Sequence, residues 1–164
     1  NSIVFKFSNI LSVLADVFIK LSLGLVFFNF GYGKLENLIN NDAEKLIGMV
    51  DSIILFGKAP VFFSWCLALS ETFIIIGLIY GLFIILPFSN TISKLSGLLA
   101  LLISLVILYQ HIYVWGDNIF LDGPIEILNA GDGKKAVYAQ FLLVSISMYI
   151  VFNKQNPNLN IENK

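Results

Sequence analysis

The most regular feature of this 164-residue sequence is a series of long apolar segments separated by short polar stretches. A helix rises about 1.5 Å per residue and the hydrocarbon core of a bilayer is about 30 Å thick, so four of these segments are long enough to cross a membrane. We expect spanning helices at about residues 11–30, 60–86, 95–113 and 136–152. A cleaved signal peptide is the alternative for residues 1–30. The length of the apolar stretch, its internal charges and the lack of a small-residue cleavage site argue against it.

A shorter amphipathic segment follows the first span. Residues Asn41 to Glu44 resemble a capping box, in which an acceptor side chain is followed three residues later by Glu. Apolar residues then recur at helical spacing, opposite a polar face, at Leu46, Ile47, Val50, Ile53 and Ile54. We therefore predict an amphipathic helix at about residues 43–56 that lies in the membrane interface, with docking onto a partner protein as the alternative.

The composition also indicates a membrane protein. Hydrophobic residues make up 57% of the chain, charged residues 13%, and the mean hydropathy is +0.84. Soluble domains carry about 25% charged residues, which they need to cover their surface. The predicted fold class is an all-α integral membrane protein, a four-helix bundle with one interfacial helix in the first loop. It forms a single domain over residues 1–153, followed by a solvated C-terminal tail at 154–164.

The charges exclude some functions and leave the orientation open. The net charge of −1 argues against binding to nucleic acid, which depends on clustered basic residues. Four spans place both termini on one side, and the lysines divide almost evenly between the two sides, so the positive-inside rule sets no orientation. The acidic residues gather on the two-loop side, which slightly favours cytoplasmic termini.

Few residues of this chain are suited to redox or metal chemistry. It has no arginine, one cysteine (Cys66) and one histidine (His111), which excludes an internal disulfide, a thiol pair and a bis-histidine haem within the chain. The acidic residues of the second loop do not have the spacing of a calcium-binding loop. We predict no metal site and no cofactor bound by this chain alone.

Three charged residues fall inside the predicted spans. Placing a charge in the hydrocarbon core costs free energy, so such residues are expected to be paired or to have a function. Lys20 lies about 15 Å below the two-loop face if the first span ends at Phe30, and Glu71 lies about 16 Å below it if the second begins at Pro60. We therefore predict that Lys20 pairs with Glu71, and that Asp16, one turn away, joins them. This cluster either locks two helices in register or lines a polar pocket for a quinone headgroup, a small anion or a proton.

A second set of candidate residues lies near the two-loop face. Tyr109, Gln110, His111 and Tyr113 at the end of the third span, with Lys34 after the first, offer hydrogen-bond donors and acceptors for a quinone carbonyl or for an interface. The alternative is that they are polar anchors at the membrane surface.

Small residues predict close helix contacts. Gly77 and Gly81 form a GxxxG pattern in the second span, and Ser96, Ala100 and Ser104 repeat a small residue every fourth position in the third. We expect tight packing inside the bundle, with a homodimer face as the alternative.

Two stretches of the sequence resemble a known family. The first runs from Lys20 to Phe27 and continues as Gly31-Tyr-Gly-Lys34-Leu35, and the second begins at Glu71 and runs through apolar residues to Gly77. Together they resemble the first- and second-helix signatures of the DoxX-like small membrane proteins. This chain departs from the pattern in two places, because Lys20 stands where the family usually has Arg and Phe30 where a His commonly precedes the glycine.

The resemblance implies a role beside respiratory redox chemistry in the bacterial cytoplasmic (inner) membrane. The partners expected from it are the lipid bilayer and other membrane subunits, with a quinone as candidate cofactor. The leading hypothesis is an accessory, quinone-proximal or structural subunit of a membrane redox complex. One alternative is the catalytic subunit of a quinone-linked oxidoreductase, with Lys20, Glu71 and His111 around the substrate. Another is a small transporter or proton-conducting protein.

Overall fold

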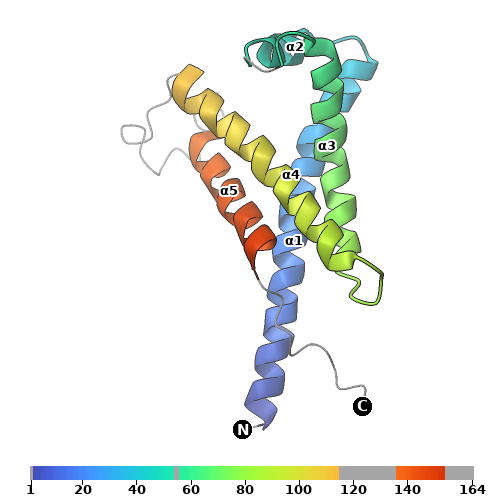
Figure 1. Ribbon diagram of the computed structural model, residues 1–164, viewed down its shortest axis with the longest axis vertical. Helices are drawn as coiled ribbons and strands as arrows, with labels where there is room; N and C mark the ends of the chain where they lie inside the picture. The colour runs from blue at the N-terminus through green and yellow to red at the C-terminus, as the bar shows by residue number, and fades with distance from the viewer. Residues whose placement is uncertain (1, 54–55, 115–135, 154–164) are drawn as a thin grey trace.

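The structure, a computed structural model, describes residues 2–53, 56–114 and 136–153, and its regular elements in these ranges are all helical (Figure 1). They are α1 (Ser2–Ile39), α2 (Glu44–Asp51), α3 (Pro60–Tyr80), α4 (Ser89–Tyr109), the π-helical turn η1 (Gln110–Val114) and α5 (Ala136–Phe152). Three stretches are long and apolar enough to cross a membrane: Ile10–Ile39, Pro60–Tyr80 and Ser89–Val114. The predicted all-helical fold is confirmed, and these three helices indicate an integral membrane protein.

Helix α1 is much longer than the predicted span at 11–30. It has 38 residues, or about 57 Å at the helical rise, and it continues past Phe30 to Ile39. Asn41 then adopts a left-handed conformation with φ 57°, and the amide of Asp42 donates to the carbonyl of Asn37 at 2.9 Å. This pattern is a Schellman motif, a common way to satisfy the last carbonyls of a helix. The turn at Asn41 thus ends the helix at Ile39. The helix does not end at Gly31 or Gly33, the two glycines that follow Phe30.

The same motif changes the start of α2. Because Asn41 closes α1, it does not cap α2, whose N-cap is Ala43 with no side-chain hydrogen bond. The predicted capping box is therefore wrong. The predicted helix at 43–56 is present but shorter, as Glu44–Asp51. Leu46 and Val50 of its predicted apolar face are buried, whereas Ile54 lies outside the described residues.

Helix α3 ends earlier than the predicted span at 60–86. It stops at Tyr80 after 21 residues, about 31 Å, which already matches the thickness of the hydrocarbon core. Pro87, which lacks an amide proton, precedes Phe88 in a left-handed conformation with φ 58°, so the chain turns here. Helix α4 consequently begins at Ser89, earlier than the predicted span at 95–113.

Helix α5 has the bounds that the sequence predicts, Ala136–Phe152. The second loop, at 116–135, and the C-terminal tail, at 154–164, lie outside the described residues.

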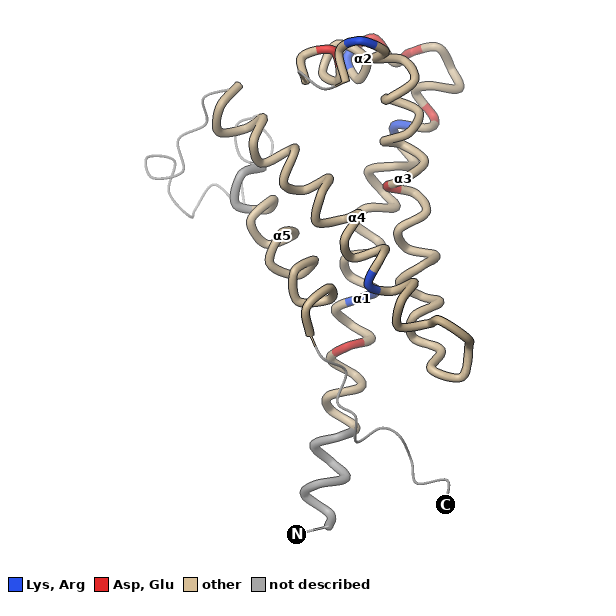
Figure 2. The backbone as a smooth tube through the Cα atoms, viewed as in Figure 1, with Lys and Arg blue, Asp and Glu red and all other residues tan. Residues whose placement is uncertain are grey.

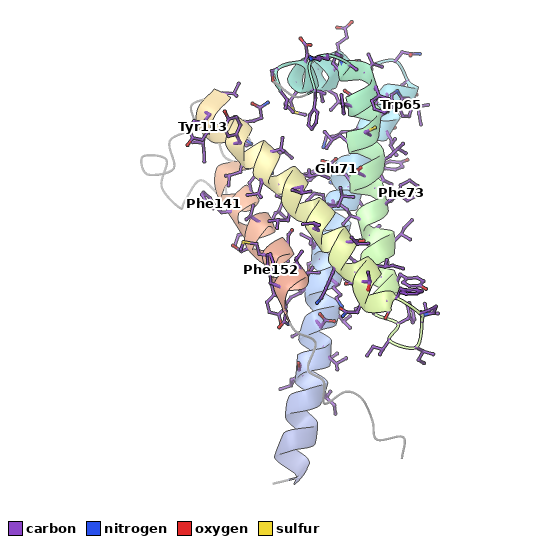
Figure 3. The ribbon with its side chains drawn as sticks, in the orientation of Figure 1. Trp65, Glu71, Phe73, Tyr113, Phe141 and Phe152 are labelled. Carbon is purple, nitrogen blue, oxygen red and sulfur yellow. The ribbon has the colours of Figure 1, made fainter. Side chains whose placement is uncertain are left out.

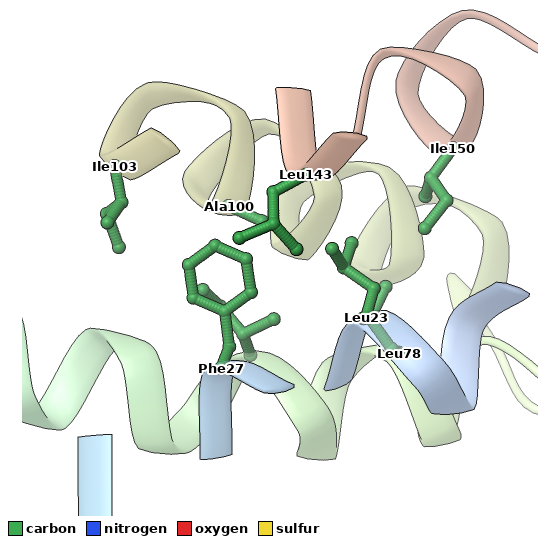
Figure 4. Close-up of a cluster of buried hydrophobic side chains, with 8 residues drawn as sticks. Leu23, Phe27, Leu78, Ala100, Ile103, Leu143 and Ile150 are labelled. Carbon is green, nitrogen blue, oxygen red and sulfur yellow. The ribbon is translucent and has the colours of Figure 1, made fainter. Parts of the chain in front are cut away.

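The four longer helices share one apolar core. Helix α1 packs along α3, α4 packs along α5, and α3 contacts α4, while α2 rests on the end of α3 (Figure 1). Figure 4 shows the core side chains converging from all four helices, among them Phe27 of α1, Leu78 of α3, Ala100 of α4 and Leu143 of α5. These contacts join the α1–α3 pair and the α4–α5 pair in one core.

Helices α3 and α4 form a V (Figure 1). At the narrow end, Gly77 and Gly81 of α3 lie against Ser96 and Ser93 of α4, so closely that a methyl group on either glycine would overlap the serine. The predicted tight packing of the GxxxG pattern inside the bundle is confirmed. Towards α2 the two helices diverge, which leaves room between them.

Two glycines of α1 provide a matched test of the α1–α3 contact. A β-carbon on Gly31 would lie 2.5 Å from the backbone nitrogen of Thr72 and 2.8 Å from the carbonyl oxygen of Ala68, whereas one on Gly33 would meet nothing within 4 Å. We expect Gly31→Ala to lower the free energy of unfolding by about 1–3 kcal/mol, because the helices must move apart. Gly33→Ala should be neutral or slightly stabilising, because alanine favours the helix. Thermal unfolding in a mild detergent measures both, and equal effects would contradict the close contact at Gly31.

Candidate functional site

Charged residues gather around α2, and few lie along the long helices (Figure 2). The sequence predicts that three of those few, Asp16, Lys20 and Glu71, meet in one cluster. The structure instead places them in two separate ion pairs.

The first ion pair joins Lys34 of α1 to Glu71 of α3. The Nζ of Lys34 donates to Oε1 of Glu71 at 2.6 Å and to Oε2 at 2.5 Å. The Glu71 side chain is 0% exposed and that of Lys34 21%, and the ring of Phe30 lies 5.8 Å from the ammonium group. Figure 3 shows Glu71 on the inner side of α3, whereas Trp65 and Phe73 project outward. The carboxylate is thus fully removed from the surface and held by one cation.

The direction of helical side chains explains why these two residues meet. Gly24 of α1 faces Ile75, and Gly31 faces Thr72, so the two helices run antiparallel. Side chains lean towards the N-terminus of their own helix. Lys34 lies one turn nearer to α2 than Gly31 and leans away from α2, while Glu71 leans towards it. The two charged groups therefore approach each other.

The predicted pair between Lys20 and Glu71 is wrong. Lys20 Nζ donates instead to Oδ2 of Asp16 at 2.7 Å and to the carbonyl oxygen of Gly81 at 3.5 Å. The reason is that α1 is longer than predicted. Because it continues past Phe30 to Ile39, Lys34 is the lysine that lies level with Glu71, and Lys20 lies farther from it. Lys20 lies fourteen residues before Lys34, about 21 Å along the helix. The predicted contact between Lys20 and Asp16 is confirmed.

The pair of Asp16 and Lys20 marks the other end of the bundle. Gly81, whose carbonyl accepts from Lys20, is the C-cap of α3. The Lys20 side chain is 5% exposed and that of Asp16 38%. The pair thus lies beside the end of α3 that is farther from α2. This pair does not form a pocket with Glu71.

A cavity of about 280 Å³ occupies the wide end of the V between α3 and α4, with α2 alongside. Its lining is aliphatic and aromatic except for three side chains, Cys66, Ser70 and Gln110. Binding sites for small molecules have this character, an apolar wall with a few polar groups that orient the ligand. The cavity is therefore the candidate binding site of the chain.

Gln110 is the most deeply buried polar group of this lining, at 3% exposure. Its Nε2 donates to the Oγ of Ser52 at 3.5 Å, and Ser52 Oγ donates to the carbonyl oxygen of Met49 at 2.6 Å. Its Oε1 is also buried and accepts no hydrogen bond from the residues that the structure describes. Gln110 thus joins the C-terminal end of α2 to the first turn of η1.

The structure does not gather the second predicted group into one site. Gln110 lines the cavity and His111 is buried beside it in η1, but Tyr109 and Tyr113 are exposed, with their ring centres 4.8 Å apart. Lys34 belongs to the ion pair with Glu71.

Sequence reasoning did not single out Ser52, Cys66 or Ser70 as site residues. Their role depends on the angle between α3 and α4 and on where α2 rests, for which local sequence carries no signal.

Comparisons with protein-family models, with curated proteins and with solved structures return no match. Among the described residues no group of three or more His, Cys, Asp or Glu side chains could hold a metal ion.

A double-mutant cycle tests the ion pair. Lys34→Met leaves the carboxylate of Glu71 buried without a partner, so we expect the free energy of unfolding in detergent to fall by about 3–5 kcal/mol. The double variant Lys34→Met/Glu71→Met should regain most of this loss, because it leaves no unpaired charge.

The matched control combines Lys20→Met with Glu71→Met. Since these residues do not touch, their effects should add to within about 0.5 kcal/mol. Strong coupling between Lys20 and Glu71, together with additivity of Lys34 and Glu71, would contradict the register of α1 on α3.

Proposed function

We propose that this chain is a quinone-proximal accessory subunit of a membrane redox complex and a DoxX-like protein. In this proposal α1, α3, α4 and α5 all cross the membrane as a four-helix bundle, and α2 lies in the interface. The observation that carries the proposal is the apolar cavity between the spanning helices α3 and α4, with polar groups at Cys66, Ser70 and Gln110.

The arrangement of helices supports four spans and one interfacial helix. Helix α5 has 17 residues, most of them apolar, and is about 26 Å long, which is at the short limit for a span, and it packs along α4. Helix α2 packs against the start of α3, buries Leu46 and Val50, and leaves Glu44, Lys45 and Asp51 exposed (Figure 1). One buried apolar face and one charged face suit a helix at a membrane surface.

The cavity fits the headgroup of a lipid-soluble ring compound. Its volume of about 280 Å³ is near the lower end of the range for ligand sites, about 300–1,000 Å³, so it would hold a ring while a hydrocarbon tail stays in the bilayer. A quinone carries oxygens at its ring and is otherwise apolar. The hydroxyl of Ser70 and the thiol of Cys66 are the donors that would hold those oxygens. When bound, a quinone would supply the electron-accepting chemistry, and the chain's own residues would position it.

An accessory role agrees better with the charged residues than a catalytic one. A catalytic site at Lys20, Glu71 and His111 would require the three side chains to surround one substrate. Lys20 is instead bound at the far end of α3, and Glu71 is bound by Lys34. The buried ion pair therefore supports the α1–α3 scaffold, as expected for a subunit that positions a quinone beside a redox partner.

Filling the cavity tests the proposal. Val106 lines the cavity, and its neighbour Leu105 is exposed outside it. After purification in mild detergent at native expression, we expect co-purified quinone to fall about tenfold in Val106→Trp, because the indole occupies the ring's position. Quinone should be unchanged in Leu105→Trp, and both variants should keep their co-migrating subunits.

The measurements are extraction of the purified protein followed by chromatography for quinone, and identification of co-migrating chains. The proposal fails if wild-type protein carries no more quinone than an unrelated membrane protein, or if no redox subunit co-migrates.

A further inference from the structure

The loop that joins α3 to α4, residues 82–88, consists entirely of apolar residues. It lies at the end of the bundle opposite α2 and carries no charge (Figures 1 and 2). Ile85 is 99% exposed and Phe88 78%, the two highest values among the exposed large hydrophobic residues. Exposed apolar surface of this extent marks a contact with a membrane or with another protein.

The acidic residues of α1 indicate how deep this loop lies. Glu36, near the α2 end, is exposed, and an exposed carboxylate stays out of the hydrocarbon core because a charge is costly there. Asp16, whose side chain is 38% exposed, precedes Glu36 by twenty residues, or about 30 Å of helix. This length equals the thickness of the hydrocarbon core, so α1 can cross the core with one acid at each border.

Lys20 connects the loop to the level of Asp16. Its Nζ donates to Oδ2 of Asp16 at 2.7 Å and to the carbonyl oxygen of Gly81, the residue before the loop, at 3.5 Å. The loop therefore begins at the edge of the hydrocarbon core. The next layer outward is the polar interface of the bilayer, about 5–7 Å on each side.

The backbone of the loop suits a layer that contains little water. The amides of Leu82, Phe83 and Leu86 donate to the carbonyls three residues earlier at 2.9, 3.1 and 3.0 Å. Pro87 has no amide proton, and its carbonyl accepts from the hydroxyl of Tyr80 at 3.1 Å. Most positions of the loop thus need no water molecule for their amides, as a segment in contact with lipid requires.

We propose that the loop at 82–88 is a lipid-binding surface, which lies in the leaflet opposite α2 and not in water. The bilayer fits better than a partner protein, because the loop continues the outer surface of the spans. Phe73 and Ile76 of α3 and Leu95 of α4 are exposed on that surface, and no charged residue occurs between Glu71 and Lys94. This inference goes beyond the proposed function and holds whether or not the cavity binds a quinone.

Fluorescence quenching in nanodiscs tests the position of the loop, because a nanodisc leaves both faces of the bilayer open to water. The full chain carries Cys66→Ser to remove its single cysteine, and Ile85→Cys to attach a bimane label. Two matched variants replace Ile85→Cys. Phe73→Cys places the label on the outward side of α3, and Lys45→Cys places it on the charged face of α2 (Figure 3).

We expect the label at position 85 to behave like the one at position 73. A nitroxide on the lipid acyl chain should quench the two to within about twofold, and iodide, an anion that apolar layers exclude, should quench position 85 about fivefold less than position 45. Ile84→Cys, at a second exposed position of the loop, should give the same result as Ile85→Cys.

Two outcomes would overturn the inference. If iodide quenches positions 85 and 45 equally and the nitroxide quenches neither, the loop lies in water. If both quenchers fail at position 85, a second copy of the chain or another protein covers the loop, and lipid does not.

Discussion

The ion pair between Lys34 and Glu71 is the constraint on which the rest of the structure depends. Inside hydrocarbon a single charge is costly, and a buried pair that loses one partner leaves the other uncompensated. Sliding α1 along α3 by one turn, about 5.4 Å, would separate the two groups, so the pair defines one register. Gly31 makes this register possible, because its missing side chain lets the α1 backbone approach Thr72 closely enough for Lys34 to reach the carboxylate.

The register in turn explains why a cavity forms. With Lys34 placed at Glu71, α1 ends beside the start of α3, and the turn at Asn41 carries the chain into α2 across that end (Figure 1). Helix α4 meets α3 closely at Gly77 and Gly81 and then diverges from it. The wide end of the V lies beneath α2, whose Val50 is buried there and lines the cavity. The cavity thus follows from one fixed register and one crossing point.

The sequence predicts the helices better than their contacts. The length of an apolar run and the helical spacing of apolar residues are local signals, and they locate α5 and the apolar face of α2 correctly. The end of α1 depends on Asn41, whose left-handed conformation is one of several that the sequence allows. Periodicity also cannot tell Lys20 from Lys34 as the partner of Glu71. Fourteen residues are almost four helical turns, so both lysines lie on nearly the same face of α1. Which of them pairs is decided by helix length and by the close contact at Gly31, and both are properties of the folded chain.

Helix α3 keeps the charge and the candidate ligand site apart. Glu71 faces α1, while Cys66 and Ser70 lie on another face of α3 and line the cavity next to α4. The scaffold therefore needs no ligand to satisfy its buried charge. Gln110 belongs to the cavity wall and also donates to Ser52 at the end of α2. The cavity wall and the position of α2 thus meet at one side chain.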